Sequence, residues 1–150
     1  MNLRVKYFDK SVEGIEVIEK GDWIDLRSRK TIEYEEGDFF LIPLNVAIEL
    51  PEGFEAHILP RSSTFKKWGL IQTNSQGVID NSFSGEKDEY MLPVIALRDG
   101  KVEKGDRICQ FRLFRTMESF RDIHGKGLNI VEVESLDNEN RGGFGSTGIK

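Results

Sequence analysis

One stretch of the sequence combines residues that can do chemistry with residues that shape a turn. It reads Gly77-Val78-Ile79-Asp80-Asn81-Ser82-Phe83-Ser84-Gly85-Glu86. Its start predicts a short strand, Asn81 and Ser82 predict a tight turn, and Phe83 begins a returning strand. Asp80 is the only acid in residues 73–85, and a lone carboxylate beside backbone donors and an aromatic ring suits a general base. The alternative is an ordinary β-turn whose Asp bonds the backbone two residues on.

A second stretch could bind an anion. After Pro60 and Arg61, residues 62–69 read Ser-Ser-Thr-Phe-Lys-Lys-Trp-Gly, which predicts one or two helical turns with a serine N-cap and a terminating glycine. A helix N-terminus offers free N–H groups and partial positive charge, and Arg61 stands beside it. The alternative is a capped helix with an arginine that faces solvent.

The last 14 residues, 137–150, are too rich in glycine and small polar residues to pack a core. They nevertheless contain Arg141 and Phe144. Flexible backbone of this kind can wrap N–H groups around phosphate oxygens, and the alternative is a disordered terminus. We therefore expect one β domain over residues 1–136 and a flexible arm over 137–150.

The elements that must position these stretches are strands. Apolar residues alternate with polar ones over residues 3–7, 44–50 and 54–58, and residues 91–98 are nearly all apolar. Pro93 within that run predicts a bulge or an edge strand. Residues 130–133 predict a last short strand. Many short strands indicate an all-β sandwich or barrel.

A recurring turn pattern supports the all-β interpretation. The pattern Glu-[Glu/Lys]-Gly-Asp occurs at residues 19–22, 35–38 and 103–106, each time just before a hydrophobic run. Glycine supplies a positive φ and aspartate bonds the local backbone. The three copies are expected to be one turn used three times.

Composition limits the class of protein. The chain has 150 residues, of which 38 % are hydrophobic and 31 % charged, and 21 basic against 26 acidic residues give a net charge of −5. This charge disfavours broad contact with nucleic acid, and no apolar run is long enough to cross a membrane. Cys109 is the only cysteine, which favours a reducing, cytoplasmic location.

Together these stretches resemble the trimeric dUTPase family. Four of its five motifs are visible in order: Pro60-Arg61-Ser62-Ser63, Gly77 to Glu86, Gly105-Asp106-Arg107-Ile108-Cys109-Gln110, and Arg141-Gly142-Gly143-Phe144-Gly145-Ser146-Thr147-Gly148. Asp25-Leu26 resembles a remnant of the first motif. The resemblance spans residues 23–148 and implies a jelly-roll-like β-barrel or sandwich with one short helix.

The resemblance implies an activity: hydrolysis of dUTP to dUMP and pyrophosphate with Mg²⁺. Asp80 would activate the water that attacks the α-phosphate and would hold the sugar 3′-hydroxyl. Asp25 would reach a Mg²⁺ ion through a water, since this ion keeps much of its hydration. The family also implies a homotrimer with active sites shared between subunits and with the arm crossing onto a neighbour.

The remaining roles are also implied by the resemblance. The uracil edge would be read by the Asn74 amide and by the backbone of Gly77, Val78 and Ile79. Phe83, where the family usually has Tyr, would lie against the sugar and exclude a ribose 2′-hydroxyl. The phosphates would meet Arg61, Ser62, Ser63, Gln110 and Arg141, with Phe144 as a lid over the base and the backbone of Gly145 and Ser146 around the terminal phosphates.

Two other functions stay open. A dCTP deaminase is similar in fold, but that family needs a catalytic Glu on the strand that follows the third motif, and residues 91–97 contain no acid. A non-catalytic or dual-role protein that senses nucleotide or binds a regulatory partner is the other alternative. Release of pyrophosphate from dUTP discriminates between these functions.

Overall fold

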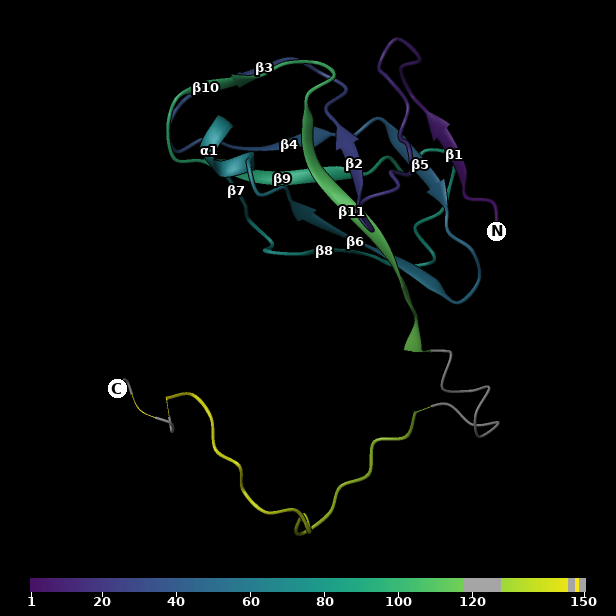
Figure 1. The fold of residues 1–150 in the computed structure, drawn as a ribbon, viewed down its shortest axis with the longest axis vertical. Coiled ribbons are helices and arrows are strands. Elements are labelled where there is room, and N and C mark those ends of the chain that lie inside the picture. Colours follow the sequence, from purple (N-terminus) through teal and green to yellow (C-terminus); the bar gives the residue numbers. More distant parts are fainter. Residues whose placement is uncertain (118–127, 146–147, 149–150) are drawn as a thin grey trace.

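The computed structural model describes residues 1–117, 128–145 and 148, and within them the chain is built from short strands and one helix (Figure 1). In chain order the elements are β1 (Arg4–Tyr7), β2 (Ile24–Arg27), β3 (Ile32–Tyr34), β4 (Phe39–Pro43), β5 (Val46–Glu49), β6 (Phe54–Pro60), α1 (Thr64–Trp68), β7 (Leu70–Gln72), β8 (Gly77–Ile79), β9 (Met91–Ala96), β10 (Gly100–Val102) and β11 (Arg107–Arg115). The only helix described has five residues, so none is long enough to cross a membrane.

The strands form two main antiparallel sheets. One has the order β2-β11-β6-β8 and the other β4-β9-β7, and the pairs β1-β5 and β10-β3 complete the body. Within the described residues the sheets do not close into a barrel, and the sandwich form of the predicted all-β fold is confirmed.

Alternation along the strands builds the core. In β9 the buried residues Leu92, Val94 and Ala96 alternate with more exposed ones, as expected for one face of a sheet. They belong to the same buried cluster as Ile58 of β6 and Phe111 of β11. Burial of each large apolar side chain contributes about 1.5–3 kcal/mol, so facing layers of this kind hold the two sheets together.

The predicted turn forms at two of its three positions. Gly37 and Gly105 have φ of 90° and 93°. In both turns the carboxylate accepts a backbone N–H at 2.8 Å, from Glu35 to Asp38 and from Glu103 to Asp106. The copy at residues 19–22 differs, because the Asp22 carboxylate is paired with Arg112 across 3.0 Å instead.

Helix α1 ends as predicted and begins differently. Gly69 has φ of 64° and its N–H bonds the Phe65 carbonyl, which is a left-handed glycine C-cap. Ser63 occupies the N-cap position but makes no side-chain capping bond. The hydroxyl of Thr64 serves this end instead, because it accepts the Arg61 N–H at 2.9 Å and donates to the Ile108 carbonyl at 2.9 Å.

Three further local expectations are wrong. Pro93 lies in β9, the middle strand of its sheet, in an unbroken register with β4. Its carbonyl accepts the Thr73 N–H at 3.0 Å, just past the end of β7. Because N and C=O of one strand residue point to the same side, the missing N–H falls where β7 has already ended.

The other two errors concern strands that do not form. After the turn at Asn81 no strand returns, and β8 pairs with β6 instead. Residues 130–133 are not a strand, and Ile130 is 97 % exposed. Figure 1 shows residues 128–145 running apart from the sheets, and within the described part of the chain they pair with no strand.

Candidate active site

The turn after β8 holds its carboxylate at the surface. The Phe83 N–H bonds the Asp80 carbonyl at 2.9 Å, which closes a β-turn. Asp80 Oδ1 accepts the N–H of Ser82 at 2.8 Å and its hydroxyl at 2.7 Å. The local bonding is that of an ordinary Asx turn, and among the described residues no group donates a hydrogen bond to the second carboxylate oxygen, Oδ2.

The two bonds from Ser82 lower the pKa of Asp80 below its usual value, the backbone bond being the larger cause. Hydrogen bonds to the charged form stabilise that form. Asp80 is exposed, so burial does little to oppose them. The group is therefore ionised at neutral pH and can accept a proton, as a general base must.

The turn is fixed to the start of β6. The side-chain amide of Asn81 donates to the carbonyls of Pro51 at 2.8 Å and Phe54 at 2.7 Å. Ser84 adds a bond from the Leu50 N–H to its hydroxyl at 3.1 Å. These contacts place Asp80 at the Phe54 end of β6.

A second group of predicted residues lies midway along β6. Gly77 pairs with Ile58 across the β6-β8 ladder. Asn74 lies beside it, because a Cβ built on Gly77 would be 3.7 Å from Asn74 Nδ2. The structure thus brings the predicted base-reading residues Asn74 and Gly77 together, with Val78 exposed and Ile79 packed on the core.

A third group, of opposite charges, lies at the far end of β6. Arg61 Nε is 3.0 Å from Asp25 Oδ1, and Arg107 approaches the other carboxylate oxygen at 3.5 Å. Gln110 pairs with Asp25 in the β2-β11 ladder and donates to the Pro60 carbonyl at 3.0 Å. A pocket of about 40 Å³ adjoins Asp25 and Arg107. Ser62 and Ser63 follow at the start of α1.

These groups are separated on a single chain. Asp80 lies near Phe54, whereas Arg61 follows Pro60 at the opposite end of the same seven-residue strand. At a rise of about 3.3 Å per residue the two ends are about 20 Å apart. The structure therefore does not place the predicted base next to the predicted phosphate-binding arginine of its own chain.

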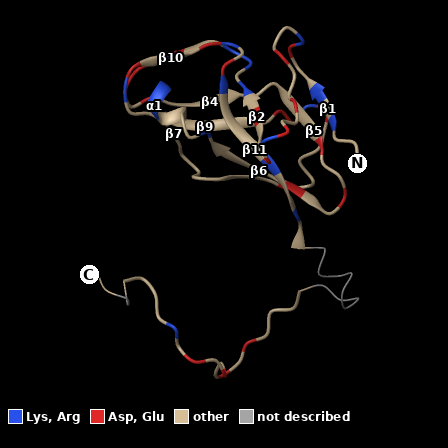
Figure 2. Ribbon diagram, viewed as in Figure 1, with Lys and Arg blue, Asp and Glu red and all other residues tan. Residues whose placement is uncertain are grey.

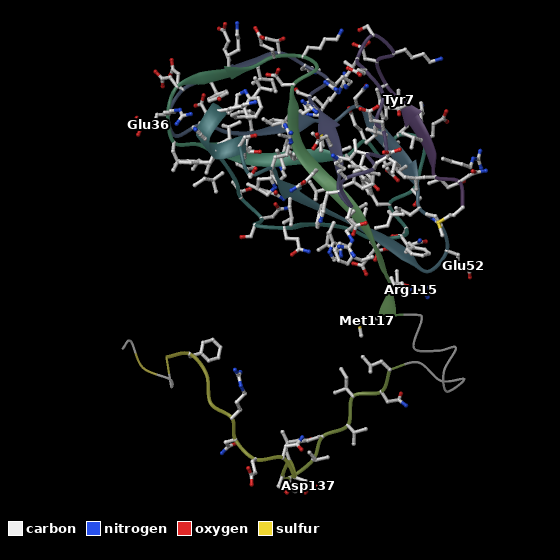
Figure 3. All side chains as sticks on the ribbon, in the orientation of Figure 1. Tyr7, Glu36, Glu52, Arg115, Met117 and Asp137 are labelled. Atoms are coloured by element: carbon white, nitrogen blue, oxygen red, sulfur yellow. The ribbon has the colours of Figure 1, made fainter. Side chains whose placement is uncertain are left out.

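The predicted residues of the arm also lie apart from the body. Phe144 is fully exposed with φ of 51°, and Gly145 has φ of 91°. Figure 3 shows Arg115 and Met117 where β11 leaves the body, with Asp137 in the separate segment that leads to Arg141. Ser146 lies outside the described residues.

The aromatic residue after the turn contacts the core. The rings of Phe83 and Tyr90 are 6.3 Å apart, and Tyr90 in turn meets Phe111 edge-on. Burial raises the pKa of the Tyr90 hydroxyl. Phe83 thus has one side on the core while 38 % of it stays exposed beside Asp80.

Sequence reasoning gave no role to two residues at these sites. Arg107 faces Asp25, and its place in the Gly105–Gln110 motif was the signal that could have found it. The buried Gln72 donates a hydrogen bond to the Asn74 side chain. No pattern in the sequence predicts this role, because a glutamine at the end of a strand is common. Figure 2 shows basic and acidic positions interspersed over the body.

Comparison with solved structures defines the class of fold. The chain superposes on a dUTPase of Staphylococcus bacteriophage 80alpha, solved as a mutant with dUpNHpp, with a TM-score of 0.76 over 99 % of each chain at 20 % identity. A mutant dUTPase from phage phi11 of S. aureus, whose structure addresses the coordination of a structural Mg(II) ion, gives a TM-score of 0.69 at 17 % identity, over 92 % of this chain and all of that one. The fold is that of the dUTPase structures.

Sequence comparison then gives the family. The dUTPase family model matches residues 23–148. The SPbeta prophage-derived deoxyuridine 5'-triphosphate nucleotidohydrolase YosS of Bacillus subtilis (strain 168) is 49 % identical over all 150 residues and over its own full length. The chain belongs to the dUTPase family.

Proposed function

We propose that this protein hydrolyses dUTP to dUMP and pyrophosphate. The observation that carries the proposal is the match along the full length of both chains to a relative named for that activity, at 49 % identity. The geometry supports it, since an ionised Asp80 and an arginine-rich group around Asp25 are the parts that such a reaction needs.

In this mechanism Asp80 orients a water and takes its proton as the water attacks the α-phosphate. The lowered pKa keeps the carboxylate ready to accept that proton. Arg61 and Gln110 hold the phosphate near the water, and Ser62 and Ser63 bind the chain of phosphates at the start of α1. Catalysis then rests on positioning and charge stabilisation.

The base and sugar are held on the β8 side. The Asn74 amide and the backbone of Gly77 to Ile79 contact the edge of uracil, and Phe83 lies against deoxyribose. Phe83 is exposed beside the turn and rests on Tyr90, which supports a role as a rigid wall. A ribose 2′-hydroxyl would collide with such a wall, so the site should reject UTP.

Mg²⁺ is the cofactor that fits these residues. Among the described residues no group of three acidic, histidine or cysteine side chains could hold a metal by itself. Asp25 is one carboxylate, already shared by two arginines. This donor set suits an ion that keeps its waters and binds mainly to substrate phosphates, where it would neutralise phosphate charge, with Asp25 contacting one of its waters.

A homotrimer with shared sites explains the separation along β6. Since Asp80 and Arg61 lie at opposite ends of that strand, a site that uses both can form where one chain's turn meets another chain's Arg61 group. The exposed residues that follow β11 support the same arrangement, because in the described part of the chain Ile130 is 97 % exposed, Val131 is 73 % exposed, and Phe144 in the arm is fully exposed. On a neighbour, Arg141 would meet the γ-phosphate and Phe144 would cover the base, with Gly145 and Ser146 wrapping the phosphates.

The division into a domain of residues 1–136 and a mobile arm of 137–150 is part of this proposal. So are a cytoplasmic location, which the buried single Cys109 fits, and the absence of a nucleic-acid or membrane partner. The structure also speaks against deamination, because Glu89, the acid next to β9, is buried and bound to Arg29 by two hydrogen bonds.

The test is pyrophosphate release from dUTP, dCTP, dTTP and UTP, with and without Mg²⁺. We expect turnover of dUTP alone, and only with the metal. Absence of dUTP turnover, with dUTP still bound, would leave a nucleotide-sensing protein as the function. Release of ammonia from dCTP would instead indicate a deaminase.

A further inference from the structure

Gln72 lies beneath the residues that are proposed to read the base. It ends β7 and is 95 % buried. Its Nε2 donates to two acceptors, the Ile58 carbonyl at 3.1 Å and Asn74 Oδ1 at 2.9 Å. Gly77 lies directly over it, since a Cβ there would be 3.5 Å from Gln72 Nε2.

The hydrogen bond between Gln72 Nε2 and the Ile58 carbonyl can run in one direction only. The Ile58 carbonyl belongs to β6, where Ile58 pairs with both Gly77 and Phe111, and a carbonyl only accepts. The Gln72 amide must therefore turn its NH₂ group toward Ile58. The reversed amide would set oxygen against oxygen at both Ile58 and Asn74.

The fixed Gln72 amide fixes the next amide. Because Gln72 Nε2 donates to Asn74 Oδ1, the Nδ2 group of the exposed Asn74 is left free of hydrogen bonds within the described residues, beside Gly77. Within the described residues the buried Gln72 Oε1 has no hydrogen-bond partner. A buried oxygen without a hydrogen bond is costly, so the contribution of the Gln72 amide comes from its NH₂ group, which donates to Ile58 and Asn74.

We propose that Gln72 is a positioning residue for base specificity, which it provides by holding the Asn74 amide with its NH₂ group toward the substrate. This inference rests on the proposed function, in which Asn74 reads the base. An outward donor matches the oxygen at position 4 of uracil and opposes the amino group that cytosine carries there. An Asn74 amide free to rotate could offer its oxygen to cytosine instead.

The test compares kcat/KM for dUTP and dCTP in the wild type and in Gln72→Met, which keeps the volume and removes both donors. We expect the dUTP preference to fall about tenfold, the value of one net hydrogen bond. The change should appear mainly in KM, with kcat for dUTP nearly unchanged, because Asp80 and the Arg61 group are untouched. Gln76→Met is the matched control, since the Gln76 side-chain amide bonds His57 and not the Asn74 side chain, and this variant should keep the wild-type preference.

A double-mutant cycle separates positioning from general damage to the turn. In an Asn74→Ala background, Gln72→Met should have no further effect on the dUTP preference. An equal loss in both backgrounds would overturn the proposal. If Gln72→Met does not fold, the wild type still tests it: the Gln72 side-chain amide protons should exchange slowly with solvent, and those of Asn74 quickly. Fast exchange at Gln72 would overturn it.

Failure of this inference is distinct from failure of the proposed function. If the wild type hydrolyses dUTP and Gln72→Met discriminates as well as the wild type, only the role of Gln72 is wrong. If the wild type does not hydrolyse dUTP, the proposed function is wrong, and Gln72 then has no base specificity to set.

Discussion

At the scale of the residue, the function depends on whether Asp80 is a base or only the first residue of a turn. Its bonds to Ser82 are those of a turn, yet both bonds go to one carboxylate oxygen and the group is exposed. The two roles are compatible, because the bonds that shape the turn also keep the carboxylate charged.

Replacement of the base tests this directly. Asp80→Asn keeps the shape and the bonds from Ser82 but cannot take a proton. We expect kcat for dUTP to fall at least about a thousandfold, within the range for loss of a general base, with Kd for dUTP changed only a few-fold. The matched control is Asp88→Asn, an acid of the same loop whose carboxylate accepts only the local Gly85 N–H. A near-normal rate in Asp80→Asn would exclude Asp80 as the base.

The pKa of Asp80 gives a second prediction. Ser82→Ala removes the hydroxyl bond and keeps the backbone bond, so the pKa of Asp80 should rise toward the ordinary value of 3.8 without passing it. Because the pKa of Asp80 is lower in the folded than in the unfolded protein, its carboxylate stabilises the fold at a pH above the unfolded pKa. This stabilisation is lost as the pH falls through the pKa of the folded state. The pKa of Asp80 in the wild type and in Ser82→Ala is measured from its side-chain carboxyl ¹³C shift as a function of pH. Identical titration midpoints would show that the Ser82 hydroxyl does not lower the pKa of Asp80.

At the scale of the element, a partly buried ion pair joins three connections between strands: Glu89 is buried, and 26 % of the Arg29 side chain is exposed. Arg29 bonds Glu89 with Nε at 2.8 Å and with a terminal nitrogen at 3.0 Å. Glu89 also accepts the Asn45 N–H at 3.0 Å, and Asn45 is buried with φ of 69°. The residues that precede β3, β5 and β9 are therefore held by one carboxylate. The bond to Glu89 also raises the pKa of Arg29.

Removal of one partner leaves the other charge buried. Arg29→Met should lower the free energy of unfolding by about 3 kcal/mol, because an unpaired buried carboxylate is strongly destabilising. Arg4→Met is the control: the Arg4–Glu49 pair is equally short but exposed, 78 % and 55 % by side chain, and should change stability by less than about 1 kcal/mol. Urea denaturation at one fixed protein concentration measures both. Equal losses would show that the Glu89 site is solvated.

Sequence patterns predicted elements well where one strand or turn decides its own structure. The alternation in β6 and β9 and the glycine turns at Gly37 and Gly105 are local signals of this kind. The predictions that failed depend on residues far away in the sequence. The Asp22 carboxylate forms an ion pair with Arg112 in place of a turn bond, and Pro93 lies beside the point where β7 has already ended. Residues 130–133 have β-branched residues suited to a strand, but no described strand of this chain pairs with them.

At the scale of the whole molecule, the residue types of the site could be recognised from the order of the motifs, but their distances could not. The order of the motifs predicts that Arg61, Asp80 and Gln110 belong to one type of site. The pairing of β6 with β8 and β11 places them at different points along β6. Only the topology shows that Arg61 and Gln110 share one end and that Asp80 lies at the other.

The distance between Asp80 and Arg61 along β6 leads to a prediction that concerns the trimer and not the single chain. If Asp80 of one subunit serves the Arg61 group of another, then Asp80→Asn and Arg61→Ala should each be nearly inactive alone and should recover activity when mixed. In trimers formed at random from equal amounts, about a quarter of the sites would receive both wild-type residues, since each site draws them from different subunits. Mixing after unfolding and refolding together, with dUTP turnover and mass by light scattering as readouts, measures this. Refolding each variant alone is the control. Trimers that stay inactive after mixing would mean that each site takes both residues from one chain, and the distance along β6 would then have to be closed by movement within that chain.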